Sequence, residues 1–201
     1  MNNNYLYEYV NDLERVFSVS YNKEYSIDAI QKRVSYSGFF QSIEKSNYPS
    51  APIITDKDLI KSLFPELDIS LVDIPIYNQC LWAAEAYLRI QDFSKLTFEA
   101  IFLYIPINKM YDYFSIYHEM DFSQIVDEFK RLFAAKSVLS LLLDKYHYSV
   151  RELSYMTNIP YDTLISLKQR KRDIKKVNIE TVVIIADALH VRVETLAELK
   201  N

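Results

Sequence analysis

Apolar side chains recur at intervals of three and four residues along most of this sequence, the spacing that gives an α-helix one buried face. Residues 5–19 and 27–45 show it first. Residues 55–58, Thr-Asp-Lys-Asp, have the form of a helix start before Leu59, and Pro65 marks the end of that helix. Residues 51–54 and 69–74 favour short extended pieces instead.

The helical spacing strengthens from Pro75 onward. Pro75 suits a first helical turn, because the N–H that proline lacks has no helical partner there. Two further helices are predicted over 97–104 and 107–118, separated by Pro106, and Asp121 is placed to cap the next one. The helix that follows Pro75 has an apolar face made of Cys80, Ala83, Ala84, Tyr87 and Leu88. The helix that follows Asp121 has one made of Ile125, Phe129, Leu132 and Phe133.

Residues 137–199 have the pattern of five short helices. Ser149 and Glu152 form a capping box, in which each side chain accepts a hydrogen bond from a backbone N–H at the helix start. Asn158 ends that helix, because asparagine tolerates the left-handed conformation of a turn. The helices begin at or near Val138, Ser149, Pro160, Ile179 and Val193. The residues expected to face inward around the turn are Leu153, Met156, Ile159, Leu164 and Leu167.

Glycine is nearly absent, since Gly38 is the only one in 201 residues, against an average usage of about 7%. Phosphate-cradling loops need several glycines at positive φ, so a P-loop and a dinucleotide-binding turn are excluded. Tight hairpins also favour Gly or Asn-Gly, and the chain has no Asn-Gly pair. The sequence therefore predicts a mainly all-α protein.

The start of the chain and its single cysteine indicate a cytoplasmic protein. Residues 1–5 lack the basic start and apolar run of a secretory signal. No stretch approaches the roughly 20 apolar residues of a membrane span. Cys80 can form no intrachain disulfide, and no nearby basic group lowers the pKa of its thiol, so we expect a small core residue.

Charge and aromatic content divide the chain near residue 136. Residues 1–136 hold 13 Lys and Arg against 19 Asp and Glu, whereas residues 137–201 hold 10 against 8, so the net charges are −6 and +2. All but four of the Phe, Tyr and Trp residues lie in the first part. We predict an acidic, aromatic-rich helical domain over 1–136 and a second domain over 137–201. The junction at 134–138 has no Gly or Pro, so we expect it to be rigid.

Residues 149–169, Ser-Val-Arg-Glu-Leu-Ser-Tyr-Met-Thr-Asn-Ile-Pro-Tyr-Asp-Thr-Leu-Ile-Ser-Leu-Lys-Gln, resemble the bihelical unit of the Xre/Cro-repressor-like family. Ser154 takes the position of a small residue where the helices cross, and Asn158 that of the usual turn glycine. Residues 186–191 resemble the end of the family's fourth helix, with His190 in place of a common Gly. The resemblance implies a five-helix, lambda-repressor-like helix-turn-helix domain and covers about a third of the chain. Residues 1–136 resemble no family that we recognise.

The resemblance assigns residues 161–169 to a recognition helix in the major groove of double-stranded DNA. The side chains expected to read bases are Tyr161, Asp162, Ser166 and Gln169. Two residues depart from the family pattern. Val150 occupies a position where the family often has a polar side chain that contacts DNA, and the valine side chain cannot form a hydrogen bond. Asp162 places a negative charge on the face that should meet DNA. A basic cluster directly follows the helix, where we expect it to bind phosphates. Its members are Lys168, Arg170, Lys171, Arg172, Lys175 and Lys176.

No other group of residues predicts a site. Residues 117–121, Tyr-His-Glu-Met-Asp, lack further ligands at metal-binding spacing, so we interpret them as a capped helix end. We find no nucleophile–base pair, and we expect neither catalysis, nor a metal, nor a cofactor.

The resemblance predicts a sequence-specific, DNA-binding transcriptional regulator of Xre/Cro type. We expect it to act as a repressor. A homodimer is expected. The chain ends at Asn201, directly after the fifth predicted helix, so we expect the two copies to pair through residues 1–136. The alternative is a protein-binding module, such as an antitoxin or a phage- or defence-related inhibitor. In that alternative residues 1–136 bind a protein partner, and the helix-turn-helix autoregulates its operon or is vestigial.

Overall fold

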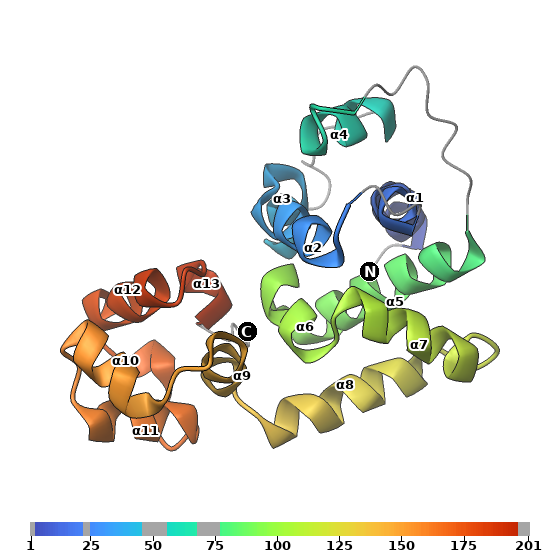
Figure 1. Ribbon diagram of the computed structural model, residues 1–201. Coiled ribbons are helices and arrows are strands. Elements are labelled where there is room, and N and C mark those ends of the chain that lie inside the picture. Colours follow the sequence, from blue (N-terminus) through green and yellow to red (C-terminus); the bar gives the residue numbers. More distant parts are fainter. Residues whose placement is uncertain (1–2, 22–24, 46–55, 68–76, 197–201) are drawn as a thin grey trace. The chain divides into compact units, whose positions relative to one another are not determined.

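The computed structural model describes residues 3–21, 25–45, 56–67 and 77–196. Every regular element within these ranges is a helix, which confirms the predicted fold class (Figure 1). None of the helices in these ranges has the length and apolar content to cross a membrane. The chain divides into two compact units, residues 1–127 and 128–201.

The helices of the N-terminal unit follow the predicted pattern closely. The structure has α4, α6 and α7 within a residue or so of the expected bounds, and Asp121 Oδ1 accepts from Ser123 N at 2.7 Å where α8 begins. The bounds are α1 Asn3–Tyr21, α2 Ile27–Tyr36, α3 Gly38–Glu44, α4 Asp56–Leu63, α5 Asn78–Ser94, α6 Phe98–Tyr104 and α7 Ile107–Tyr117. Helix α8, Ser123–Ala135, begins in this unit and ends in the C-terminal unit.

Residues 27–45 form two helices rather than one uninterrupted run. Ser37 has an extended conformation, with φ −70° and ψ 128°, and it ends α2 and begins α3. The apolar spacing survives this break because Phe39, Phe40 and Ile43 are buried again on the next helix. The expected extended pieces at 51–54 and 69–74, and Pro75, lie outside the described residues.

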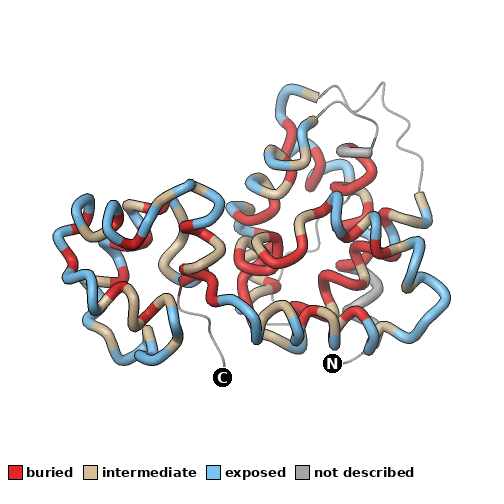
Figure 2. The backbone as a smooth tube through the Cα atoms, turned by 60° about the horizontal axis from the view of Figure 1, so that its bottom comes forward, coloured by how far each residue is buried: buried red, intermediate tan, exposed pale blue. Residues whose placement is uncertain are grey.

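Aromatic rings form much of the core of the N-terminal unit, as the uneven distribution of Phe and Tyr predicts. Helix α1 packs along α5, and Phe17 meets Tyr87 edge-on with ring centroids 5.6 Å apart. Tyr87 also contacts Phe102 and donates from its hydroxyl to the carbonyl of Ile105 at 2.7 Å. Cys80 is fully buried, and this burial raises the pKa of its thiol. Figure 2 shows buried and exposed residues alternating along the helices, as one-sided helical burial requires.

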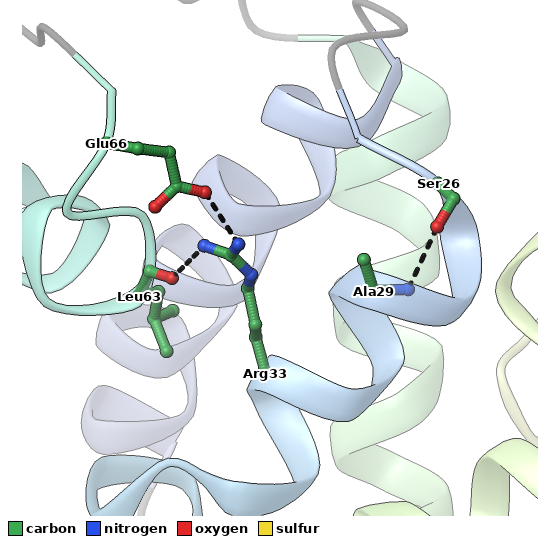
Figure 3. Close-up of polar contacts among 5 residues, drawn as sticks. All are labelled: Ser26, Ala29, Arg33, Leu63 and Glu66. Atoms are coloured by element: carbon green, nitrogen blue, oxygen red, sulfur yellow. Dashed lines mark hydrogen bonds and ion pairs between the residues drawn. The ribbon is translucent and has the colours of Figure 1, made fainter.

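Arg33 joins α2 to the last residue of α4 and to the segment that follows it (Figure 3). Its guanidinium donates to the carbonyl of Leu63 and, at 2.6 Å, to the carboxylate of Glu66. The same group lies 5.0 Å from the ring centre of Tyr25 and 4.7 Å from that of Phe64. The hydrogen bond from Arg33 lowers the pKa of the Glu66 carboxyl from 4.5 to about 2.

This depressed pKa makes the stability of the N-terminal unit sensitive to acid. A carboxyl whose pKa is lower when folded stabilises fully above its unfolded pKa, here 4.5, and the stabilisation disappears as the pH falls towards 2. The Glu66 side chain is 48% exposed, so solvent screening keeps the effect small. We expect Glu66→Gln to lower the urea midpoint at pH 7 and to flatten its decline between pH 4.5 and 2. The same measurement on Glu119→Gln, whose side chain is exposed, provides the control. Parallel profiles for wild type and Glu66→Gln would contradict the assignment.

The C-terminal unit has a small core that is mainly aliphatic. Its helices after α8 are α9 Val138–Tyr146, α10 Val150–Thr157, α11 Tyr161–Lys168, the 3-10 helix η2 Ile174–Lys176, α12 Ile179–Ala188 and α13 Val193–Leu196. Helix α10 packs against α11 and α12, and α9 packs against α11 and α13. The buried aliphatic side chains include Val138, Leu142, Leu153, Leu164, Leu167, Val182, Ile185, Leu189 and Leu196.

Candidate nucleic-acid interface

Helix α10 begins at the predicted capping box. Ser149 Oγ accepts from the backbone N–H of Glu152 at 3.1 Å, and Glu152 Oε2 accepts from the backbone N–H of Ser149 at 2.7 Å. The second bond lowers the pKa of the Glu152 carboxyl, so the carboxylate that completes the cap is favoured. Two N–H groups that an isolated helix start leaves unpaired are therefore bonded, and the start of α10 is defined by local chemistry.

The turn between α10 and α11 has the predicted left-handed residue, Asn158, with φ 55°. Two hydroxyl groups that the sequence pattern did not single out for hydrogen bonding also hold this turn. Ser154 Oγ donates to the carbonyl of Ile159 at 2.6 Å, and Thr157 Oγ1 accepts from the backbone N–H of Ile159 at 3.4 Å. Ile159 is buried, as expected. The turn therefore fixes the direction in which α11 leaves α10.

The prediction that Met156 faces inward is wrong, because its side chain is 51% exposed. The buried residues of α10 are Val150, Leu153 and Thr157. These three follow each other at intervals of three and four residues, so they form one stripe, and Met156 lies one residue before the last of them. Burial of Val150 also explains why this position lacks a polar side chain.

Helix α11 turns Leu164 and Leu167 into the core and leaves polar side chains towards solvent. Tyr161, Asp162 and Gln169 are exposed, and Ser166 is partly exposed. Ser166 Oγ donates to the backbone carbonyl of Asp162 at 2.6 Å, so its hydroxyl hydrogen is used and its lone pairs remain as acceptors. Asp162 lies in the first turn, where a negative charge stabilises the helix.

Arg151 is a basic residue near this surface that the sequence pattern did not identify. Its guanidinium carbon lies 6.0 Å from the ring centre of Tyr161, although the two residues belong to different helices. The contact bridges the turn, and only the packing of α10 on α11 brings the two together. A cation therefore lies beside the first residue of α11.

The basic cluster follows the other end of α11 and is exposed at Lys171, Arg172, Lys175 and Lys176. The backbone N–H groups of Lys171 and Arg172 both donate to the carbonyl of Ser166, at 2.9 and 3.2 Å. Asp173 then caps η2 by accepting from the backbone N–H of Lys175 at 3.0 Å. Local hydrogen bonds thus hold the backbone of the cluster close to the end of α11, while the four side chains are exposed to solvent.

Comparison with known proteins identifies this arrangement. Residues 138–201 match the family of Cro/C1-type HTH DNA-binding domains. Residues 138–201 are a Cro/C1-type helix-turn-helix domain. The match confirms the resemblance noted for the C-terminal third, and it supports a DNA-binding regulator in general. No curated protein and no solved structure matches the chain.

Arg170 differs from the other basic residues of the helix-turn-helix domain. It has φ 54°, in the left-handed region, and its guanidinium donates to the carbonyl of Phe133 on α8. The guanidinium carbon also lies 4.2 Å from the centre of the Phe133 ring. Ser137 Oγ adds a bond to the carbonyl of Lys168 at 2.7 Å. The end of α11 is therefore attached to the end of α8 and the start of α9, and Arg170 holds this contact. Lys168, the remaining predicted phosphate residue, is partly buried.

Replacing Arg170 with alanine should lower the free energy of unfolding of the C-terminal unit by about 2 kcal/mol, through the lost charged hydrogen bond and ring contact. Arg170→Gly should cost less, because glycine adopts positive φ without strain. Lys171→Ala is the matched control and should change stability by less than about 0.5 kcal/mol. Urea unfolding of fragment 128–201 measures all three. Equal effects at residues 170 and 171 would show that the Phe133 contact does not stabilise the unit.

Proposed function

We propose that this protein is a sequence-specific transcriptional regulator that inserts α11 into the major groove of DNA and represses the genes it binds. The observation that carries the proposal is the outer face of α11. Tyr161, Asp162 and Ser166 lie on this helix, Gln169 caps its C-terminal end, and cations lie near both ends. Repression follows most simply, because a protein bound across a promoter excludes other proteins from it. Such a regulator acts in the cytoplasm.

Each of the four side chains has a chemistry that suits a base edge. A carboxylate accepts from the N4 amino group of cytosine, which gives the acidic Asp162 a role on a face that meets DNA. Glutamine makes a two-bond contact to adenine, which suits Gln169. Ser166 offers acceptor lone pairs, since its hydrogen is bonded to the carbonyl of Asp162. Tyr161 adds an aromatic ring and a hydroxyl at the start of the helix.

Phosphate contacts would position α11 from both ends. Lys171, Arg172, Lys175 and Lys176 are exposed beyond its C-terminal end, and Arg151 lies beside Tyr161 at its N-terminal end. Contacts to phosphates fix the register of a protein on DNA but carry no sequence information. In this proposal Arg170 supports the surface through Phe133, and the other cations contact the DNA backbone.

Mapping the DNA bound by the tagged protein across the genome tests this proposal. We expect a limited set of sites that share a short motif, with affected genes derepressed when the protein is deleted. A variant with Ser166→Ala and Asp162→Asn should lose these sites while its abundance is unchanged. Occupancy without a shared motif, or no occupancy above background, would overturn sequence-specific binding.

Specificity, more than general affinity, should depend on Tyr161, Asp162 and Ser166. A good base contact contributes about 1–3 kcal/mol of discrimination against the wrong base. Tyr161→Ala, Asp162→Asn and Ser166→Ala should each reduce the preference for the operator over unrelated DNA by roughly tenfold or more. Tyr155→Ala is the control, because Tyr155 is 87% exposed but belongs to α10. If the three variants retain the wild-type preference in fluorescence anisotropy titrations, α11 is not the reading helix.

A protein-binding module is the second candidate, and the surface of α12 favours it. Ile179, Val183 and Ile184 are exposed on this helix, next to the exposed acidic residues Glu180 and Asp187. Such a face suits a protein partner with apolar and basic groups. An antitoxin or inhibitor with an autoregulating helix-turn-helix would also bind a basic protein partner through its acidic N-terminal half. A toxin gene beside this one would support that candidate, and coexpression with the toxin would test it.

A further inference from the structure

The C-terminal unit contains a cavity of about 570 Å³, and all the residues that line it belong to this unit. It lies between the end of α8, the start of α9, the end of α11, the basic cluster and α13. Its volume is in the range of pockets that bind small molecules, about 300–1,000 Å³. The residues that line it are Phe133, Ala134, Ser137, Leu139, Leu167, Arg170, Arg172, Asp173, Ile174, Lys175 and Leu196.

The lining has two chemically distinct parts. One part is apolar and comes from four different helices, with Phe133, Leu139, Leu167 and Leu196 among its members. The other part is basic, because three basic residues, Arg170, Arg172 and Lys175, line it together with one acidic residue, Asp173. Asp173 already accepts from the backbone N–H of Lys175, so part of its hydrogen-bonding capacity is used. The cavity therefore combines an apolar wall with an excess of positive charge.

We infer that this cavity binds a small amphipathic anion, a molecule with an apolar body and one carboxylate, sulfonate or phosphate group. The apolar body would lie against Phe133, Ala134 and Ile174, the apolar lining residues that are at least partly exposed. The anionic group would meet Arg172 and Lys175. Arg172 is exposed, so its guanidinium is able to turn towards the cavity or towards solvent. Arg170 contributes its charge from a fixed position, since it is bonded to Phe133.

Occupation of the cavity would regulate DNA binding, and this second step rests on the proposed function. Arg172 and Lys175 belong both to the cavity and to the proposed phosphate-binding surface. A bound anion would neutralise part of the charge that the phosphates of DNA need. By linkage, the ligand lowers the affinity for DNA by the same factor by which DNA lowers the affinity for the ligand.

Two fluorescent dyes that differ by one charged group test the binding step on the full-length protein. One is 8-anilinonaphthalene-1-sulfonate, and the other is N-phenyl-1-naphthylamine, which has the same rings without the sulfonate. We expect saturable binding of the sulfonate at one site per chain. Arg172→Gln should weaken binding of the sulfonate about tenfold, the contribution expected of a charged hydrogen bond, and should change binding of the neutral dye less than twofold.

Lys171→Gln is the matched control, because Lys171 is the exposed neighbour of Arg172 but does not line the cavity. It should leave both dye affinities unchanged. Ala134→Trp fills the cavity from an exposed position and should abolish the site for both dyes, while circular dichroism and the urea midpoint show that the variant is folded. Equal effects of the variants at 171 and 172, or undiminished binding to folded Ala134→Trp, would overturn the inference.

A DNA titration separates the two steps. With wild-type protein, saturating 8-anilinonaphthalene-1-sulfonate should weaken DNA binding at least threefold, and Ala134→Trp should be insensitive to it. If the dye occupies the cavity while DNA affinity stays the same, the regulatory step is overturned and the binding site stands. If the protein binds no DNA at all, the proposed function fails, and the dye titrations still decide whether the cavity is a ligand site.

Discussion

Alanine at Lys171, Arg172 and Lys175 together should weaken binding to DNA of every sequence by several hundredfold near 0.1 M salt. All three residues are exposed beyond the end of α11. Each lost phosphate contact removes about 0.9 from the slope of log K against log salt, so the slope should fall by about 2.7. Arg170 is left in place, since its guanidinium holds Phe133. Anisotropy titrations on operator and on unrelated DNA at four salt concentrations give both quantities.

The control for this variant removes the same charge elsewhere. Lys57, Lys61 and Lys130 are exposed and lie outside the helix-turn-helix domain. Their replacement by alanine should leave the salt slope unchanged, because only residues that contact DNA phosphates contribute to it. If both triple variants lower affinity alike, net charge accounts for the effect, and the basic cluster has no local role.

The second large effect is expected on removal of the N-terminal unit. Full-length protein should sediment as a dimer, and fragment 128–201 as a monomer that binds the operator at least about 100-fold more weakly. A single helix-turn-helix covers one half-site, and paired domains engage half-sites about 34 Å apart. The N-terminal unit carries exposed apolar residues suited to pairing, among them Phe93, Ile116 and Met120. The fragment starts at residue 128 so that Phe133 remains available to Arg170.

The exposed face of α12 is the competing dimer contact, and one substitution distinguishes the two. Ile184→Glu places a charge in the middle of that face. If pairing uses the N-terminal unit, full-length Ile184→Glu remains a dimer with unchanged operator affinity. A fragment that dimerises as well as the full chain, or dissociation caused by Ile184→Glu, would contradict pairing through residues 1–127.

Local chemistry explains why much of the helix-turn-helix could be predicted. The capping box of Ser149 and Glu152 involves residues three apart, and the left-handed Asn158 follows from the conformational preference of one side chain. His190 likewise adopts positive φ at the position where the resemblance places a glycine. Such features depend on neighbours along the chain, so sequence spacing is enough to locate them.

Burial was predicted less well than helix position. The spacing of α10 allowed Met156 to face inward, but the helix packs through Val150, Leu153 and Thr157. A short helix with apolar residues on more than one side offers several possible inner faces, and contact with α11 and α12 selects among them. Residues 27–45 show a related case, in which regular apolar spacing continues across the break at Ser37.

The amino-acid sequence by itself determined the all-helical class, the helix boundaries around the turn and the polar outer face of α11. Each of these follows from periodicity and from the conformational preferences of single residues. The tertiary structure alone decided which cations are exposed and which are tied to the protein. It placed Arg170 on Phe133, 37 positions earlier in the chain, and Arg151 over Tyr161. It also formed the cavity from four helices and the basic cluster. Contacts between residues distant in sequence depend on how the helices pack, and no local pattern encodes them.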